Sequence, residues 1–196
     1  MAYTQVKTPI VYYGGKTSIL PHLLEMVPVH EVYTETFFGG GTLFWAKDPV
    51  KNETINDRLD IVINFYKTLK LNYAPLKRLI DATLISRSIH NEALDFIRKY
   101  KKAFEADSLN LSSADRVKLA WAFWVKTNFS QMNKLNGGYK QEKGGGRSIA
   151  QSLTNRKEQF TEMLVTRIQN ATIENTDYSI VLNARNSLKA FQNCNY

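Results

Sequence analysis

The sequence predicts an α/β fold in which a parallel sheet is interrupted by a mainly helical insert. Near the N-terminus, short runs rich in β-branched and aromatic residues alternate with segments of helical period, as in a doubly wound sheet. The middle of the chain shows consecutive helical patterns without a strand pattern between them. A strand-like run returns at residues 171–177. Two α/β segments therefore flank the insert, whose length and polar loop suggest a second lobe.

The segment VYYGGKTSIL, at residues 11–20, predicts a glycine turn before a helix that starts near Thr17. A phosphate-binding P-loop is the alternative for its Gly-Gly-Lys-Thr sequence. That motif requires a glycine five residues before the glycine that precedes the lysine, and Ile10 occupies this position. A phosphotransferase is therefore a distant alternative for this chain.

A strand is predicted over residues 31–38, followed by three glycines at 39–41 and the start of a helix at 43–48. Glycines between a strand and a helix let a ligand approach the backbone closely. A dinucleotide-binding fingerprint would have a further glycine three residues after Gly41, where this chain has Phe44. The pattern argues against a nicotinamide or flavin site, and it suits a smaller nucleoside cofactor.

A second short strand is predicted over residues 53–57, and a helix over 58–71 where apolar residues recur with a helical period. Asp57 ends this strand, 18 residues after Gly39. An acidic side chain there can accept hydrogen bonds from both hydroxyls of a ribose. It can equally cap the helix that follows. The spacing alone leaves both roles open.

Three helices are predicted over residues 74–85, 91–106 and 113–126, the last with Ser113 as its cap. Residues 127–148 are polar and glycine-rich, and Asn136-Gly137 is a tight-turn signal. A helix over residues 155–169 would begin with a capping box formed by Asn155 and Glu158. The strand at 171–177 and a short helix at 178–186 complete the predicted elements.

Composition and charge narrow the possible partners. The chain has 26 Lys and Arg residues against 18 Asp and Glu, a formal charge of +8, which favours a polyanionic partner such as nucleic acid. The one cysteine, Cys194, excludes internal disulfides, and the scattered histidines show no ligand spacing, so no metal site is predicted. No apolar run approaches the roughly 18 residues of a membrane span, and the N-terminus has no apolar signal core. We expect a cytoplasmic protein without a membrane partner.

Three ordered motifs make the assignment more specific. An aromatic-x-Gly-Gly-Lys segment, a Glu-x-Phe-x-Gly-x-Gly loop, and an acidic residue before a helix with a tyrosine resemble the opening of adenine-specific DNA methyltransferases of the DNA adenine methylase type. The resemblance covers roughly residues 8–70 and, less closely, 155–196. Two positions depart from the family pattern: Tyr12 replaces a tryptophan and Thr36 replaces a proline. The residues that carry the resemblance are Tyr12, Gly14, Gly15, Lys16, Glu35, Phe37, Gly39, Gly41, Asp57 and Tyr66.

The resemblance implies a Rossmann-like S-adenosylmethionine-dependent methyltransferase core, incomplete in this chain, with an inserted, mainly helical target-recognition domain. Residues 1–72 would form the first part of the core, 73–153 the insert, and 154–196 the return to the core. Asp57 would bind the ribose of S-adenosylmethionine, Glu35 the methionine amine, and Lys16 the methionine carboxylate or the target-base pocket. The cofactor-binding residues that the resemblance implies are Tyr12, Gly14, Gly15, Lys16, Glu35, Phe37, Gly39, Gly41, Asp57 and Asp177.

By the same resemblance, the insert would bind double-stranded DNA through a hairpin loop at residues 127–148. Lysine and arginine side chains contact phosphates, whereas asparagine and glutamine read base edges in the major groove. A surface loop without function is the alternative. The expected DNA-binding residues are Asn128, Gln131, Asn133, Lys134, Asn136, Tyr139, Lys140, Lys143 and Arg147.

The catalytic Asp-Pro-Pro-Tyr loop of this family, which holds the flipped adenine, has no counterpart in the sequence. The chain contains no Pro-Pro pair, and its Asp48-Pro49 is followed by Val50 in a predicted turn. We therefore assign no catalytic residue and expect this chain alone to be inactive, with one sheet edge left unpaired.

The leading hypothesis is a site-specific DNA adenine methyltransferase in a truncated or partner-requiring form, in which a second chain could supply the catalytic loop. The alternative is a non-catalytic subunit of a split methyltransferase that binds DNA or S-adenosylmethionine.

Overall fold

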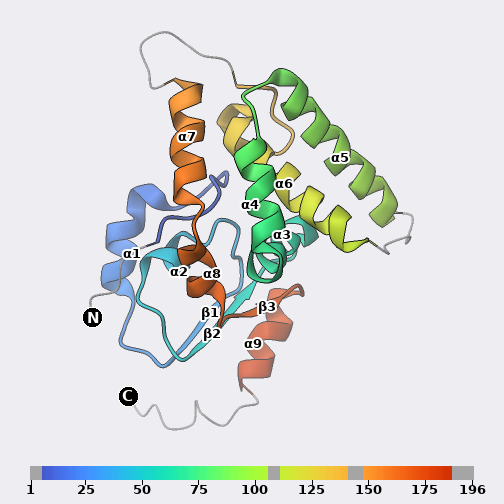
Figure 1. Cartoon of the computed structure of the whole chain (residues 1–196). Helices are drawn as coiled ribbons and strands as arrows, with labels where there is room; N and C mark the ends of the chain where they lie inside the picture. The colour runs from blue at the N-terminus through green and yellow to red at the C-terminus, as the bar shows by residue number, and fades with distance from the viewer. Residues whose placement is uncertain (1–5, 106–110, 141–147, 187–196) are drawn as a thin grey trace.

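The structure is a computed structural model that describes residues 6–105, 111–140 and 148–186 (Figure 1). Its sheet has three parallel strands in the order β1 (Val32–Glu35), β2 (Asn52–Asn56) and β3 (Thr172–Glu174). The central residue Ile55 is fully buried and pairs with Glu35 on one side and Ile173 on the other. The predicted α/β class with a small parallel sheet is confirmed, although β1 and β3 are shorter than the sequence pattern suggested and β2 begins one residue earlier.

The helices near the sheet follow the predicted order. A short 3-10 helix, η1 (Thr17–Ile19), leads into α1 (Leu20–Met26), and α2 (Thr42–Ala46) follows the glycines after β1. Helix α3 (Asp60–Leu71) follows β2, but it begins two residues later than predicted. The reason is local: an Asp57 carboxylate oxygen accepts a hydrogen bond from the Leu59 amide at 2.9 Å and keeps residues 58–59 out of the helix.

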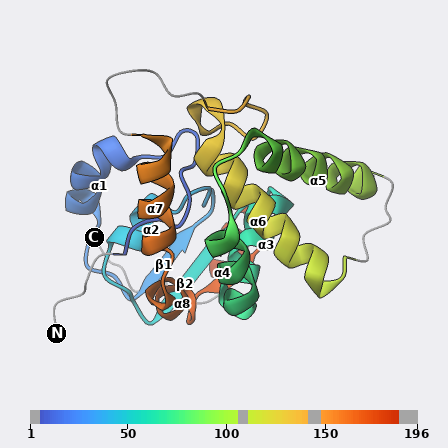
Figure 2. The same ribbon diagram turned by 45° about the horizontal axis from the view of Figure 1, so that its top comes forward.

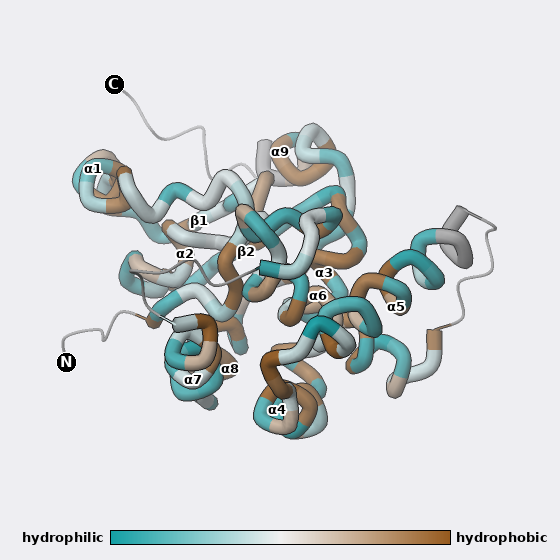
Figure 3. The backbone as a smooth tube through the Cα atoms, turned by 90° about the horizontal axis from the view of Figure 1, so that it is seen from above, coloured by the Kyte–Doolittle hydropathy of each residue, from teal (hydrophilic) through white to brown (hydrophobic). Residues whose placement is uncertain are grey.

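The helical middle of the chain contains α4 (Tyr73–Ala82), α5 (Arg87–Glu105) and α6 (Ser113–Phe129). The cap of α6 is Ser112 rather than Ser113, because the Ser112 hydroxyl accepts the Asp115 amide at 3.1 Å. Helix α6 is buried along most of its length. Figure 3 places α3 and α6 between the sheet and α5, and Figure 2 shows the same order from another side.

The prediction of one helix over residues 155–169 is wrong, because two helices occupy this region. Helix α7 (Ile149–Gln159) is capped by Ser148, whose hydroxyl accepts the Gln151 amide at 3.0 Å, and α8 (Glu162–Ile168) follows after a break. The capping box fails because Asn155 lies inside α7. The helix is interrupted at Phe160. This side chain is fully buried and stacks on Tyr73, and the Tyr73 hydroxyl donates to the Phe160 carbonyl at 3.0 Å. Helix α9 (Tyr178–Asn186) matches the predicted short helix.

One hydrophobic core connects the sheet with the helical middle. Phe65 of α3 lies 5.7 Å from Phe123 of α6 and 6.4 Å from Phe160, measured between ring centroids. Residues on both sides of the expected boundary at 72 and 73 belong to this cluster. Whether residues 73–153 act as a recognition domain stays a prediction. Among the described residues, no helix has both the length and the apolar character to span a bilayer.

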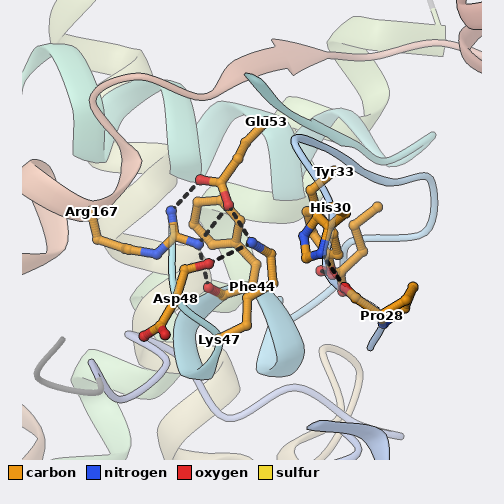
Figure 4. Close-up of polar contacts among 9 residues, drawn as sticks. Pro28, His30, Tyr33, Phe44, Lys47, Asp48, Glu53 and Arg167 are labelled. Atoms are coloured by element: carbon orange, nitrogen blue, oxygen red, sulfur yellow. Dashed lines mark hydrogen bonds and ion pairs between the residues drawn. The ribbon is translucent and has the colours of Figure 1, made fainter. Parts of the chain in front are cut away.

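A buried ion cluster ties α2, β2 and α8 together (Figure 4). Lys47 and Arg167 both contact the Glu53 carboxylate, and all three side chains are at most 5% exposed. The Lys47 ammonium lies 2.7 Å from a Glu53 oxygen, and the Arg167 guanidinium also donates to the Phe44 carbonyl at 2.6 Å. The cluster adjoins β1, because the Lys47 ammonium lies 4.4 Å from the centroid of the Tyr33 ring.

Candidate cofactor site and nucleic-acid interface

A cavity of about 480 Å³ lies at the carboxyl end of β1, within the size range of small-molecule sites. Its walls come from the N-terminal segment 12–16, from β1 and from the glycine turn that leads into α2. In open α/β sheets, ligands bind beyond the carboxyl ends of the strands. Eight of the ten predicted cofactor residues line this cavity: Tyr12, Gly14, Gly15, Lys16, Glu35, Phe37, Gly39 and Gly41.

The glycine turn is closed over a buried aromatic ring. Gly41 has a φ of +62°, and its amide donates to the Phe38 carbonyl at 2.6 Å. A Cβ atom at Gly41 would lie 2.3 Å from the Phe38 ring, which is itself 2% exposed. Only glycine therefore fits here, for reasons of both backbone conformation and space.

The two glycine motifs, which are far apart in the sequence, meet at this cavity. The Tyr12 ring lies against the turn, at 3.0 Å from where a Cβ atom of Gly39 would stand. The Gly15 amide donates to the Tyr12 carbonyl at 2.9 Å, which forms the predicted N-terminal turn. Lys16 is exposed and lines the cavity. Ile10, which argued against a P-loop, is fully buried in the core.

Asp57 does not line the cavity, but it holds the turn that does. One carboxylate oxygen accepts the Gly39 amide at 2.8 Å and the other accepts the Leu59 amide at 2.9 Å. The Tyr66 hydroxyl donates to the Gly39 carbonyl at 2.9 Å, so Gly39 is held from both sides. A carboxylate has about four acceptor sites, so two remain for a ribose. Asp57 therefore forms a turn before α3 and does not cap it, since the N-cap of α3 is Leu59, and the ribose role stays a prediction.

Glu35 is the acidic group in the cavity wall. Burial raises the pKa of its carboxyl to about 7. The Tyr33 hydroxyl, which donates to it at 2.8 Å, the Phe44 backbone and the cations Lys47 and Arg167 oppose this rise, so about 7 is the net pKa. Tyr33 itself lines the cavity, and the sequence analysis missed it. The period of two along a strand, which puts Tyr33 and Glu35 on one face, could have identified it.

An aromatic pair stands at the open side of the site. Phe37 lines the cavity with 72% of its surface exposed, and its ring lies 5.3 Å from that of Tyr178. Asp177 lies outside the cavity lining and accepts hydrogen bonds from the Ser179 amide and hydroxyl, which lower the pKa of its carboxyl. Its predicted contact with the cofactor is not tested by this geometry.

The described part of the predicted loop, residues 127–140, consists of the end of α6 and a hairpin that closes where the Lys140 amide donates to the Phe129 carbonyl at 2.8 Å. Ser130 and Tyr139 form an antiparallel bridge, and the Gln131 amide donates to the Gly138 carbonyl at 2.8 Å. A tight turn lies one residue earlier than the Asn136-Gly137 signal indicated: the Gly137 amide donates to the Lys134 carbonyl at 2.9 Å, so Leu135 and Asn136 are its central residues. A second 3-10 helix, η2 (Gln131–Asn133), lies at its start.

A buried lysine anchors this hairpin to α5 and α6. The fully buried Lys126 ammonium donates to the Gly137 carbonyl at 2.9 Å and lies 2.8 Å from His90 Nε2. Burial and, as the smaller cause, the charge of Arg98 lower the pKa of Lys126 to about 8. The Tyr139 ring, one of the predicted DNA contacts, packs edge-on against His90 at 5.6 Å.

The other predicted DNA contacts have different environments. Asn128 is half-buried and donates to the Trp124 carbonyl at 2.8 Å, whereas Gln131, Lys134, Asn136 and Lys140 are exposed. The Lys134 ammonium lies 4.6 Å from the centroid of the Tyr13 ring, so the hairpin adjoins the wall of the cofactor cavity. Asn133 is partly exposed, and Lys143 and Arg147 lie outside the described residues.

A parallel sheet with a glycine turn and a cavity beyond β1 is the arrangement in which α/β proteins bind nucleotide-like cofactors. Comparison with known families is more specific. The chain belongs to the D12 class N6 adenine-specific DNA methyltransferases, whose family model matches residues 12–191. It is also similar to the Type II methyltransferase M1.LlaDCHI of Lactococcus lactis subsp. cremoris, with 38% identity over 68 residues. That match covers 34% of this chain and 24% of the lactococcal protein.

Proposed function

We propose that this protein takes part in transferring a methyl group from S-adenosylmethionine to the exocyclic amine of adenine in double-stranded DNA. The observation that carries the proposal is the meeting of two separate glycine motifs over one cavity at the carboxyl end of β1. The family to which the chain belongs supports the reaction class. Such an enzyme works where the DNA is, which favours the cytoplasmic location.

The residues of the cavity fit the proposed cofactor. Glu35 would hold the methionine amine, Lys16 its carboxylate, and Asp57 the ribose hydroxyls through its two remaining acceptor sites. S-adenosylmethionine supplies an electrophilic methyl group when bound. The glycine turn brings the backbone close to the ligand, and Tyr12 closes the site from the N-terminal side.

We also propose that a further strand pairs with the free edge of β1. Among the described residues, β1 pairs with β2 alone, and the cavity lies along residues 33–37 at this edge. A parallel strand there would end beside the cavity, where an Asp-Pro-Pro-Tyr loop could hold a flipped adenine. A second chain could supply that strand. If none does, the alternative is a subunit that binds cofactor or DNA without methylating.

Replacing Asp57 by alanine is expected to weaken S-adenosylmethionine binding by about a hundredfold or more. The change removes two charge-assisted hydrogen bonds to the ribose, each of which contributes about 1.5–3 kcal/mol. Titration calorimetry measures the affinity, and Asp60→Ala, at the start of α3, is the control. Asp57 also accepts the Gly39 amide, so its loss could weaken binding by disturbing the glycine turn. Asp57→Asn keeps an acceptor for that amide, and an unchanged melting temperature in either variant would show that the turn is intact and that the ligand contact was lost. An unchanged affinity in Asp57→Ala would refute the ribose role.

A tritiated-methyl transfer assay on DNA separates the enzyme from the binding subunit. We expect the chain alone to bind S-adenosylmethionine with little or no transfer, because no Asp-Pro-Pro-Tyr sequence is present in it. Transfer should appear when a protein that carries this loop is added. Rapid transfer by the chain alone would show that other residues perform the chemistry.

The affinity for S-adenosylmethionine is expected to fall about tenfold or more between pH 7 and pH 5.5. The Glu35 carboxyl has a pKa of about 7, so it becomes protonated in this range and loses its attraction for the cofactor's ammonium. Calorimetry at several pH values measures the slope. Glu35→Gln should bind weakly with almost no slope, and a slope that persists in this variant would contradict the assignment.

A further inference from the structure

A second, smaller cavity lies between the hairpin and α7, away from the residues assigned to the cofactor. Its volume is about 180 Å³. The N-terminal segment contributes Val11, the hairpin contributes Asn133 and Lys140, and α7 contributes Ser152 and Arg156. The cavity thus joins three predicted DNA contacts, Asn128, Asn133 and Lys140, with residues of α7 that the sequence analysis did not single out.

The described lining of this cavity is positively charged. Arg156 and Lys140 line it, its described lining contains no Asp or Glu, and neither cation forms an ion pair among the described residues. Arg156 is partly buried, and within the described part of the chain its side chain makes one hydrogen bond, a long one of 3.4 Å to the Gln159 side chain. A partly buried guanidinium without an anion is unfavourable, so the cavity is suited to receive one.

The size and donors of the cavity favour a phosphate group. Its volume is below the roughly 300 Å³ at which sites for drug-sized molecules begin. A guanidinium matches the geometry of phosphate oxygens, and a lysine ammonium adds a point charge. Asn133 can donate through its amide, whereas the Asn128 amide nitrogen is already bound to the Trp124 carbonyl.

The position of the cavity relates it to the cofactor site. Val11 lines this cavity, and the next two residues, Tyr12 and Tyr13, line the cofactor cavity. Lys134 of the hairpin packs on the Tyr13 ring at 4.6 Å. A DNA strand that places a base at the cofactor site would therefore carry its neighbouring backbone past Arg156.

We propose that Arg156, with Lys140 at the rim, binds a backbone phosphate of the DNA next to the target adenine. The inference rests on the proposed function, because it takes DNA as the substrate. Arg156 lies on α7, outside the hairpin. Because it would contact a phosphate and not a base, it would position the DNA independently of the base sequence. Arg156 would thus help to fix the register of the duplex.

The test is the salt dependence of DNA binding, measured by fluorescence anisotropy with a short duplex at several salt concentrations. Arg156→Gln should lower the slope of log affinity against log salt by about 0.9, and the affinity by about eightfold at 0.1 M salt, for every sequence tested. Arg156→Lys should retain most of the slope. Lys140→Gln, at an exposed position, should reproduce the loss without risk to the fold, and Lys99→Gln on α5 should change nothing.

An unchanged slope in Arg156→Gln and Lys140→Gln would overturn the inference, as would a wild-type chain that does not bind DNA. A loss confined to one DNA sequence would also overturn it, because a phosphate contact cannot read bases. A further outcome would assign the site to free phosphate instead of DNA. In that case, millimolar inorganic phosphate would protect the wild type but not Arg156→Gln against thermal unfolding, while the salt slopes of DNA binding would be equal in the two proteins. Calorimetry with S-adenosylmethionine, expected to be unchanged in both variants, tests the proposed function separately.

Discussion

Replacing Glu53 by glutamine is expected to destabilise the protein by about 3–5 kcal/mol, because it leaves two buried cations without their anion. Lys47 and Arg167 both contact the Glu53 carboxylate, and all three side chains are almost completely buried. Glutamine keeps the size of the side chain but removes the charge. Thermal and urea unfolding should show a melting temperature lower by about 10 °C or more.

The control is Asp81→Asn, which breaks the exposed ion pair with Lys77 on α4. Exposed pairs contribute about 0–1 kcal/mol, so this variant should unfold almost like the wild type. If Glu53→Gln were as stable as Asp81→Asn, the ion cluster would not hold α2, β2 and α8 together. The expected loss would also disturb the cofactor cavity, since Lys47 and Arg167 both act on Glu35.

Replacing Gly41 by alanine should cost about 3 kcal/mol and abolish measurable binding of S-adenosylmethionine. The positive φ of +62° costs a residue with a side chain about 1–2 kcal/mol. The added methyl group would also overlap the Phe38 ring at 2.3 Å, and overpacking of a core costs about 1–3 kcal/mol. Phe38 packs edge-on against Phe44 and Tyr66, so it has little freedom to move.

Gly14→Ala is the matched control for this variant. Gly14 also has a positive φ, +78°, but a Cβ atom there would meet nothing within 4 Å. It should therefore show the conformational cost alone, about 1 kcal/mol. Equal stability losses in the two variants, measured by urea unfolding, would show that the contact with Phe38 contributes nothing.

The sequence predicted the elements whose patterns are local. The strand, glycine turn and helix around residues 32–46 were found because β-branched residues, three glycines and an apolar run follow one another within a few positions. The two glycine motifs were assigned to one site through a family resemblance, and the structure brings Tyr12 against Gly39. The Asn136-Gly137 pair likewise predicted a tight turn, although the structure centres it one residue earlier, on Leu135 and Asn136.

Features that depend on distant residues were not predictable from local patterns. The break between α7 and α8 follows from burial of Phe160 against Tyr73, which overrides the helical period of residues 155–169. Glu53 and Arg167 are 114 residues apart, and in the sequence each resembles an ordinary surface charge. The contact between Lys126 and the hairpin was also not predictable. Lys126 lies in an apolar stretch of helix, and its partner is a backbone carbonyl, which no sequence pattern identifies.

The central claim is that S-adenosylmethionine binds in the cavity between the two glycine motifs. Ultraviolet cross-linking of the tritiated cofactor to the intact chain, followed by trypsin digestion and mapping of the labelled peptides, tests it most directly. The label should be saturable and should lie in the tryptic peptides of residues 8–16 and 17–47, which carry the cavity wall. Absence of saturable labelling, or a saturable label confined to peptides of the helical middle, would contradict the claim.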